Sequence, residues 1–190
     1  TKADNYTITK TEGTLTVTAL TDKVTVTITE NSGSEKYDGT AKTVTGYKVT
    51  SISNPLYKEA DFEFKGNATV TATDAGTYNM ELKPADFTNT NTNFTNVEFV
   101  IVDGTLEIAK RTVTLTSADD DKVYDGTALT NDEVTVGGDG FATGEGATYD
   151  VTGSQTEVGS SANAFTYELN DGTKADNYTI TKTEGTLTVT

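Results

Sequence analysis

The sequence of 190 residues contains no cysteine, no histidine and no tryptophan, and it has only two prolines and one methionine. Without cysteine, no disulfide framework can form. Without histidine or cysteine, the chain lacks the commonest general base and two of the usual nucleophile arrangements. The G-x-S-x-G and G-x-x-x-x-G-K-[ST] motifs do not occur either. We therefore expect a protein that is not an enzyme and that uses no cofactor.

Positive charge is also scarce. Lysine and arginine number 14 against 29 aspartates and glutamates, which gives a net charge of −15. Because so acidic a chain repels phosphate groups, we expect no binding to nucleic acid or to an anionic membrane surface. No apolar run approaches the ~20 residues that a membrane-spanning helix needs. We therefore expect no membrane insertion.

What the sequence does contain is repetition. Residues 1–18, TKADNYTITKTEGTLTVT, are identical to residues 173–190, so one period spans 173 − 1 = 172 residues. Within this period GTL recurs at 13, 104 and 185, and YDGT recurs at 37 and 124. Such self-similarity indicates a tandem array. We divide the chain into residues 1–21, the closing hairpin of a preceding repeat, residues 22–109, a first β repeat, and residues 110–190, a second β repeat.

Alternation with period 2 predicts that both repeats are built from β-strands. Val24, Val26 and Ile28 alternate with threonine in the first repeat, as Val113 and Leu115 do in the second. This pattern gives each strand one buried face and one wet face, as in antiparallel sheets. Short strands separated by Gly, Asn and Asp turns therefore predict an all-β fold of two tandem small antiparallel β-sandwiches, immunoglobulin-like in type.

The end of each repeat is predicted to be a β-hairpin. Residues 93–108 and 177–190 each place Asp-Gly or Glu-Gly between two apolar-rich segments, and a tight turn needs such a glycine. The alternative fold, β-grasp-like, would need a helix of at least two turns, whereas the best helical candidate, PLYKEA at 55–60, fits a single turn. The near-absent linker at Ala109 and Lys110 predicts a stiff, elongated array.

Three motifs resemble the MBG and YDG-type repeats of large bacterial surface proteins: YDGT after a first strand, DAGTY at 74–78, and the NY-x-I…G-T-L-x-V segment that starts at Asn177. Residues 54–83 look like repeats of surface adhesins from gut Firmicutes. The resemblance implies a non-catalytic stalk or adhesive module at the bacterial cell surface, attached to the cell wall through parts of a longer chain. Its implied partners are adjacent repeats of the same chain.

DAGTY also resembles the D-x-G-x-Y corner of immunoglobulin-like domains, in which the Tyr hydroxyl bonds back to the preceding loop. The equivalent region of the second repeat, residues 156–167, keeps Gly159 but lacks the Asp and the Tyr at the expected spacing. The corner is therefore expected in the first repeat alone.

The repeated YDGT motif is interpreted as a turn. Asp–Gly supplies a positive φ, and the ring of Tyr37 or Tyr124 covers the edge of the core. The acidic run Asp119-Asp120-Asp121 could hold Ca²⁺, but its spacing departs from the D-x-[DN]-x-[DN]-G loop. A solvated loop is the preferred interpretation, and no metal site is predicted.

A Lys–Asn isopeptide bond would need both partners buried beside a carboxyl group. Strand parity places Lys23 on the polar face, opposite Val24, and places Asn177 opposite the inward Tyr178. We therefore expect no such bond on these strands.

Three tyrosines without an obvious place in the core, Tyr47, Tyr57 and Tyr149, are weak candidates for ligand contacts. An exposed tyrosine ring can stack on a sugar, although packing at the edge of a thin core is the preferred explanation for such residues. Two functions follow. The first is a structural segment that projects a binding region from the cell wall. The alternative is a module that binds carbohydrate or a host protein through exposed tyrosines.

Overall fold

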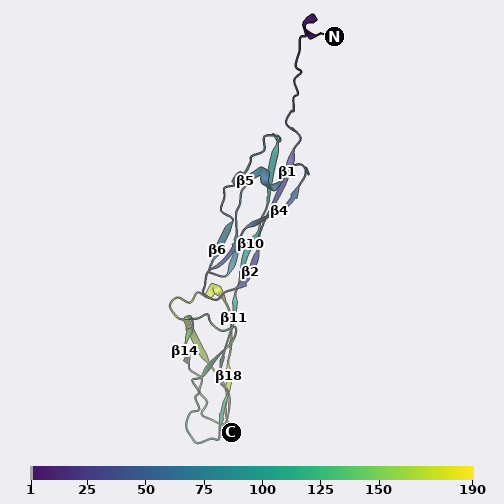
Figure 1. Ribbon diagram of the computed structural model, residues 1–190. Coiled ribbons are helices and arrows are strands. Elements are labelled where there is room, and N and C mark those ends of the chain that lie inside the picture. The colour runs from purple at the N-terminus through teal and green to yellow at the C-terminus, as the bar shows by residue number, and fades with distance from the viewer. Residues whose placement is uncertain (1) are drawn as a thin grey trace. The chain divides into compact units, whose positions relative to one another are not determined.

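The computed structural model describes residues 2–190, which form β-strands joined by loops and short 3₁₀ turns (Figure 1). The strands of the first repeat are β1 (Val24–Glu30), β2 (Gly33–Lys36), β3 (Lys42–Thr45), β4 (Tyr47–Ile52), β5 (Phe62–Phe64), β6 (Thr69–Ala72), β7 (Gly76–Asn79), β8 (Phe87–Asn89), β9 (Val97–Val102) and β10 (Thr105–Ala109). Those of the second are β11 (Arg111–Ser117), β12 (Asp120–Lys122), β13 (Val134–Gly138), β14 (Ala147–Val151), β15 (Gly159–Asn163), β16 (Phe165–Leu169), β17 (Tyr178–Thr183) and β18 (Gly185–Val189).

The predicted all-β class is confirmed. Strands make up 48% of the chain and no helix reaches seven residues, so the described residues lack the helix that a β-grasp requires. The 3₁₀ turns are η1 (Ala3–Asn5), η2 (Glu59–Asp61), η3 (Pro84–Asp86) and η4 (Ala175–Asn177). The alternation is confirmed as well, because every second residue of β1, from Val24 to Glu30, is buried. Several small sheets arranged in this way are consistent with a β-sandwich.

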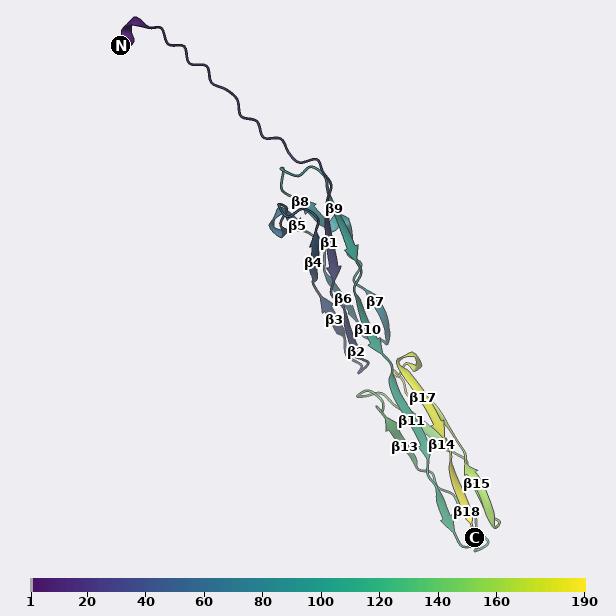
Figure 2. The same ribbon diagram turned by 90° about the vertical axis from the view of Figure 1, so that its right-hand side faces the viewer.

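Each repeat pairs its first strands with its last strands. In the first repeat the three-stranded sheets are β4-β1-β9 and β2-β10-β7, and in the second they are β13-β11-β17 and β12-β18-β15. The pairs β2–β10, β11–β17 and β12–β18 are parallel, whereas β10–β7, β11–β13 and β15–β18 are antiparallel. Figure 2 shows β17 beside β11 and β18 beside β15. The two-stranded sheets β3-β6, β5-β8 and β14-β16 complete the fold.

The predicted closing hairpins are wrong. β17 and β18 lie in different sheets, as do β9 and β10, so the chain passes from one sheet to the next at the GTL motif. Neither Gly104 nor Gly185 has a positive φ. A Cβ added to Gly185 would lie 2.4 Å from the Ala118 carbonyl oxygen, and one added to Gly104 would lie 2.3 Å from the Asn31 carbonyl oxygen. The glycine is required by close backbone approach and not by a turn.

A buried side chain at the end of the first strand holds each of these passages. The Glu30 carboxylate accepts hydrogen bonds from the backbone N–H of Gly104 at 2.8 Å and of Leu82 at 2.6 Å. In the second repeat the Ser117 hydroxyl accepts from the Gly185 N–H at 3.0 Å and donates to the Asn163 carbonyl at 2.6 Å. Because both side chains are buried, losing either would leave backbone N–H groups unsatisfied, at about 1–3 kcal/mol each.

By their contacts the residues form two compact units. One contains the residues up to Ile28, Val49–Gly66 and Lys83–Ile101. It contains two groups of packed aromatic rings: Tyr57 with Phe94, and Phe62, Phe64, Phe87 and Phe99 with one another. The other contains Thr29–Lys48, Asn67–Leu82 and Val102–Thr190, and therefore holds part of the first repeat together with the whole second repeat.

The N-terminal segment differs from its C-terminal copy. Residues 6–19 lie in no strand, and every residue from Lys2 to Thr21 is exposed. The chain joins the first repeat at Leu20, which forms a parallel bridge with Phe94. The assignment of residues 1–21 to a preceding repeat stays a prediction, and its first residue, Thr1, lies outside the described residues.

We predict that Gly185→Ala destabilises the protein by about 1–3 kcal/mol, because the new methyl group has no room beside the Ala118 carbonyl. Gly13→Ala is the matched control, since Gly13 is the same motif position in the exposed segment and a Cβ there meets nothing within 4 Å. Urea unfolding of both variants measures the difference. Equal effects of the two substitutions would show that close approach is not the reason for the glycine.

Candidate functional site

The candidate site is the junction at which the end of the first repeat meets the second, and it begins at Tyr37. Tyr37 follows β2, and its N–H donates to the Ala109 carbonyl at 2.9 Å. The next two residues form the predicted turn: Gly39 has a φ of 82°, and the Asp38 carboxylate accepts from the Thr40 N–H at 2.8 Å. Hydrogen bonds from Lys42 and Thr40 hold the pKa of Asp38 well below its usual range. The turn interpretation of YDGT is confirmed.

The Tyr37 side chain is buried against residues of the second repeat. Its hydroxyl donates to one Glu145 carboxylate oxygen at 2.5 Å, and the Tyr178 hydroxyl donates to the other at 2.7 Å. The two tyrosine rings meet edge to face, with centroids 5.6 Å apart. The Tyr178 hydroxyl also accepts from the Ala142 N–H at 3.0 Å. Burial, together with the Glu145 carboxylate, raises the pKa of Tyr37 and of Tyr178 to about 12.

Arg111, the single arginine of the sequence, connects the two repeats at this point. One of its guanidinium nitrogens donates to the Tyr37 carbonyl at 3.3 Å, and Nε donates to the Gly140 carbonyl at 2.9 Å. Nearby, the Lys36 ammonium group pairs with the Asp139 carboxylate at 2.6 Å. The planar guanidinium can hold backbone carbonyls from both repeats at once because its donors are fixed in one plane.

Asn177 corrects the expectation from strand parity, because it is fully buried. Its amide nitrogen donates to the Asp74 carboxylate at 3.0 Å, and its amide oxygen accepts from the Ala75 N–H at 2.7 Å. Lys174 pairs with the same Asp74 carboxylate at 2.7 Å. Hydrogen bonds from Lys174 and Asn177 lower the pKa of Asp74. The alternation of inward and outward side chains does not hold for Asn177, because this residue ends the 3₁₀ turn η4 and precedes the strand.

The predicted tyrosine corner positions the loop that Asn177 binds. The Tyr78 hydroxyl donates to the Asp74 carbonyl at 3.0 Å, as the D-x-G-x-Y resemblance implied. The corner therefore fixes the Asp74 and Ala75 backbone within reach of Asn177. This prediction is confirmed for the first repeat.

The two YDGT copies lie in different environments. Tyr37 is 4% exposed, whereas Tyr124 is 48% exposed and is flanked by the exposed Val123. Their turns are nevertheless alike, since Gly126 has a φ of 79° and Asp125 accepts from the Thr127 N–H at 2.9 Å. The expectation that the ring covers a core edge is correct for Tyr37 and wrong for Tyr124.

The predicted tyrosine contacts do not come together. Tyr57 is buried, packs edge to face on Phe94 and donates its hydroxyl to Asn89 at 3.0 Å, so its prediction as an exposed ligand contact is wrong. Tyr47, on β4, is half-buried. Tyr149 is also half-buried, because its side chain lies on the inward-facing side of β14 and packs on Phe165.

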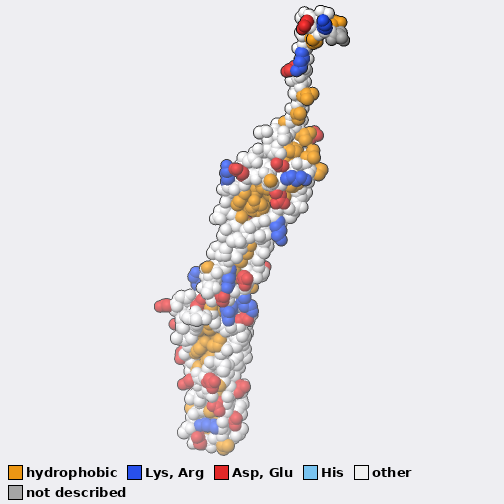
Figure 3. Space-filling view, viewed as in Figure 1, with side chains coloured by type: hydrophobic (Ala, Val, Ile, Leu, Met, Phe, Trp, Pro, Cys, Tyr) orange, Lys and Arg blue, Asp and Glu red, His pale blue; other side chains and the backbone are white. Residues whose placement is uncertain are grey.

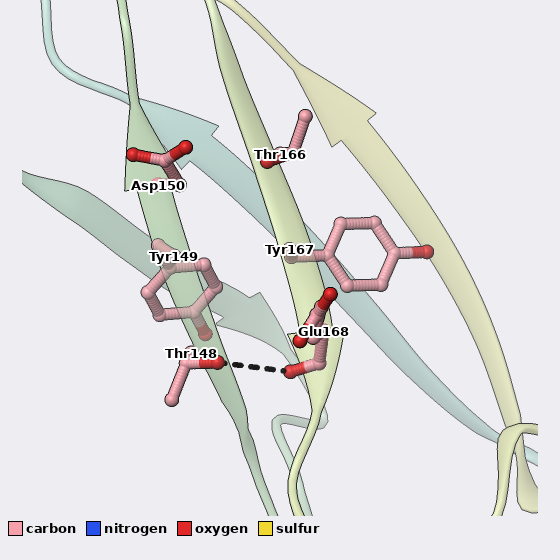
Figure 4. A pocket seen from close by; sticks show the side chains of 6 residues that line it. All are labelled: Thr148, Tyr149, Asp150, Thr166, Tyr167 and Glu168. Carbon is pink, nitrogen blue, oxygen red and sulfur yellow. Dashed lines mark hydrogen bonds between the residues drawn. The ribbon is translucent and has the colours of Figure 1, made fainter.

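A shallow hollow lies over β14 and β16 (Figure 4), and its lining residues are Thr148, Tyr149, Asp150, Thr166, Tyr167 and Glu168. Tyr149 and Tyr167 are opposite each other in the antiparallel register. Burial raises the pKa of Tyr149. Because side chains alternate along a strand, the two tyrosines lie on one face of this sheet, and Asp150 and Glu168 lie on the other.

The side chains of the acidic run form hydrogen bonds within the second repeat. Asp119 accepts from the Thr186 N–H at 2.6 Å, and Asp120 accepts from the Asn131 amide at 2.9 Å. Within residues 2–190, no group of three or more His, Cys, Asp or Glu side chains has an arrangement that could hold a metal ion. Lys23 lies on the surface as parity predicted, where it pairs with Glu98 at 2.6 Å.

Sequence reasoning missed Glu145, Arg111, Asp74 and Asn177 as parts of one site. Glu145 lies in a loop between glycines that carries no recognisable motif. The available signals were the isolated arginine at the start of the second repeat and the Asn-Tyr pair just before its last strands. Neither signal identifies a partner, because the partners are 74 and 103 residues away in the sequence.

At this junction the first β repeat contacts the second through hydrogen bonds with Glu145 and Asn177. Residues 23–110 match the MBG domain family, so the first repeat is of the MBG type. MBG domains are repeat domains found in surface proteins. Comparison with curated proteins and with solved structures gave no match. No helix among the described residues has the length and apolar character needed to cross a membrane.

We predict that Tyr37→Phe lowers the free energy of unfolding by about 1 kcal/mol, because it removes a buried hydrogen bond to the Glu145 carboxylate. Tyr124→Phe is the control at the equivalent position of the other YDGT copy, and it should change stability by less than about 0.5 kcal/mol. Urea titrations compare the two. An unaffected Tyr37→Phe variant would argue against the hydroxyl contact.

We also predict a loss of stability at alkaline pH. The folded-state pKa of Tyr37 and Tyr178, about 12, lies above the ordinary value of 10.0, so the neutral form is favoured by folding. Their contribution is complete below pH 10 and disappears as the pH rises through 12. Urea unfolding at successive pH values should show this decline. Tyr37→Phe should reduce it, and an identical pH profile in that variant would contradict the assignment.

Proposed function

We propose that this chain is a non-catalytic structural segment of a bacterial cell-surface adhesin, in which tandem repeats project a binding region from the cell wall. The observation that carries the proposal is the junction itself. Glu145 and Asn177 of the second repeat form hydrogen bonds with Tyr37, Asp74 and Ala75 of the first, and the Tyr178 ring packs edge to face on Tyr37. Contacts of this kind resist reorientation of one repeat against the next.

The surface chemistry supports the same proposal. The outward positions of the first strands are threonines, which favour strands and remain soluble. A net charge of −15 makes neighbouring copies repel each other. Both features discourage pairing between similar strands of different repeats. The MBG match, which is typical of surface proteins, agrees with a location outside the cell.

The proposal assigns a role to the exposed Tyr124. If repeats follow one another with a period of 172 residues, the YDGT turn of the second repeat faces the start of another first repeat, as Tyr37 faces the second. Val123, which precedes it in the chain, and Val158 are also exposed, and we expect that neighbour to cover them.

We therefore predict that Tyr124 becomes protected when a further copy of residues 19–109 is joined after Thr190. Nitration with tetranitromethane, followed by mass spectrometry, should show slower modification of Tyr124 in the extended chain. Tyr6, which is 62% exposed in the N-terminal segment, is the internal control and should react equally in both chains. In solution scattering the longest dimension should also grow with each added repeat. A particle that stays compact would contradict the proposed array.

The alternative function is binding of carbohydrate or of a host protein, and the hollow over β14 and β16 is the observation that favours it (Figure 4). A glycan array with the intact chain tests this alternative. Binding that Tyr167→Ala abolishes and Tyr124→Ala leaves unchanged would support it. An array without any bound glycan would count against the carbohydrate form of this proposal.

A further inference from the structure

The first repeat has an apolar pocket at the end where the chain enters β1. Its volume is about 360 Å³, and its lining includes Leu20, Leu56 and Phe94. Phe94 is buried, whereas Leu56 is 69% exposed and Leu20 is 39% exposed. Figure 3 shows hydrophobic side chains at this end of the repeat, where residues 17–20 join it. None of the described residues that line the pocket is charged, so the pocket suits an apolar or aromatic side chain.

The pocket is formed by the same parts of the fold that receive Tyr37 in the second repeat. The sheets β4-β1-β9 and β13-β11-β17 correspond to each other, and so do the pairs β5-β8 and β14-β16. Leu56 lies in the loop between β4 and β5, and Glu145, which binds the Tyr37 hydroxyl, lies in the loop between β13 and β14. Phe94 lies in the segment that leads into β9, and Tyr178, whose ring packs on Tyr37, starts β17. The apolar pocket is therefore the counterpart, in the first repeat, of the Tyr37 site.

The sequence brings Tyr124 to this pocket when a first repeat follows a second one. The Tyr124 N–H donates to the Thr190 carbonyl at 2.9 Å, which is the bond that Tyr37 forms at the end of β10. Thr190 ends the duplicated segment, and its copy, Thr18, lines the apolar pocket and is followed directly by Ala19. A YDGT turn that is bonded to this position therefore places its tyrosine ring beside the pocket.

We propose that the apolar pocket receives the Tyr124 ring from the second repeat of the copy that precedes it in a tandem array. The inference rests on the proposed array and identifies the surface at which consecutive copies meet. An edge-to-face contact of Tyr124 with Phe94 would be the counterpart of the contact that Tyr37 makes. Because Tyr124 is 48% exposed and Leu56 is 69% exposed, the insertion buries apolar surface that neither repeat covers alone.

The two kinds of junction then differ in their chemistry. Where the second repeat follows the first, the Glu145 carboxylate accepts the tyrosine hydroxyl. Where the first repeat follows the second, the lining offers apolar side chains together with the amides of Asn91 and Asn93. A charge introduced at Leu56 should therefore weaken the second kind of junction, because the charge would have to lose water without gaining an ion partner.

The test uses the chain that is extended by residues 19–109 after Thr190, which contains two copies of Leu56 but a single Tyr124. In the proposed arrangement only the added copy's Leu56 faces Tyr124. We expect Leu56→Asp in the added copy to raise the rate of Tyr124 nitration by tetranitromethane about fivefold, toward the rate in the unextended chain. The same substitution in the original copy is the matched control and should leave the rate unchanged.

The outcomes separate this inference from the proposed function. A Tyr124 that is protected in the extended chain and stays protected with Leu56→Asp in the added copy would overturn the pocket assignment and leave the array in place. Equal nitration of Tyr124 with and without the added copy would overturn both. An equal effect of Leu56→Asp in either copy would also overturn the pocket assignment, because only one of the two pockets can face Tyr124.

A second variant covers the case in which aspartate at position 56 disturbs the fold. The sequence has no tryptophan, so Tyr124→Trp places a single fluorophore at the proposed contact. Its emission should shift to shorter wavelength when residues 19–109 are added, because the indole leaves water. Leu56→Ala in the added copy should reverse part of this shift, and Leu56→Ala in the original copy should not. Equal emission from these two variants would overturn the proposal.

Discussion

The passage of the chain from one sheet to the next at Gly104 and Gly185 is the constraint on which each repeat depends. At this point two backbone segments approach so closely that a single Cβ would collide with a carbonyl oxygen. The buried N–H of the glycine must then find a partner, and the last residue of the first strand supplies it: Glu30 in one repeat and Ser117 in the other. Different side chains satisfy the same donor because the geometry demands an acceptor and not a charge. This arrangement lets the final strands of a repeat join two sheets in succession and bury Leu106 and Leu187.

The junction between the repeats depends on these passages. Because β10 continues from Gly104 beside β2, Tyr37 follows β2 at the position where its N–H meets the Ala109 carbonyl. The ring then lies against Tyr178, which starts β17, and both hydroxyls share Glu145. On the other side the tyrosine corner presents the Asp74 carboxylate and the Ala75 N–H to Asn177. The motifs that define the repeat, YDGT and DAGTY, are thus the elements that contact the neighbouring repeat.

Much of this fold could be predicted from local patterns. Alternation placed Val24, Val26 and Ile28 inward, Asp–Gly predicted the turn after Tyr37, and D-x-G-x-Y predicted the bond from Tyr78 to Asp74, since each depends on residues close in sequence. The failures involve distant partners. A glycine between two apolar segments suits a hairpin as well as a crossing between sheets, and only the position of the Ala118 backbone distinguishes them. Tyr57 and Asn177 were misplaced because aromatic packing on Phe94 and the Asp74 loop bury them.

The eighteen duplicated residues show, within one molecule, what the local sequence determines and what the tertiary structure determines. The sequence by itself determines the 3₁₀ turn at Ala3–Asn5 and Ala175–Asn177 and the ion pair two residues apart, since both copies have them whether or not they touch anything else. It also determines the alternation that makes one face apolar. Strand formation was decided by the tertiary structure. Residues 178–183 and 185–189 are strands because β11, β12 and β15 complete their hydrogen bonds, and residues 6–17 are not, because they have no such neighbours. A strand satisfies its backbone groups only through another strand, whereas a 3₁₀ turn satisfies them within itself.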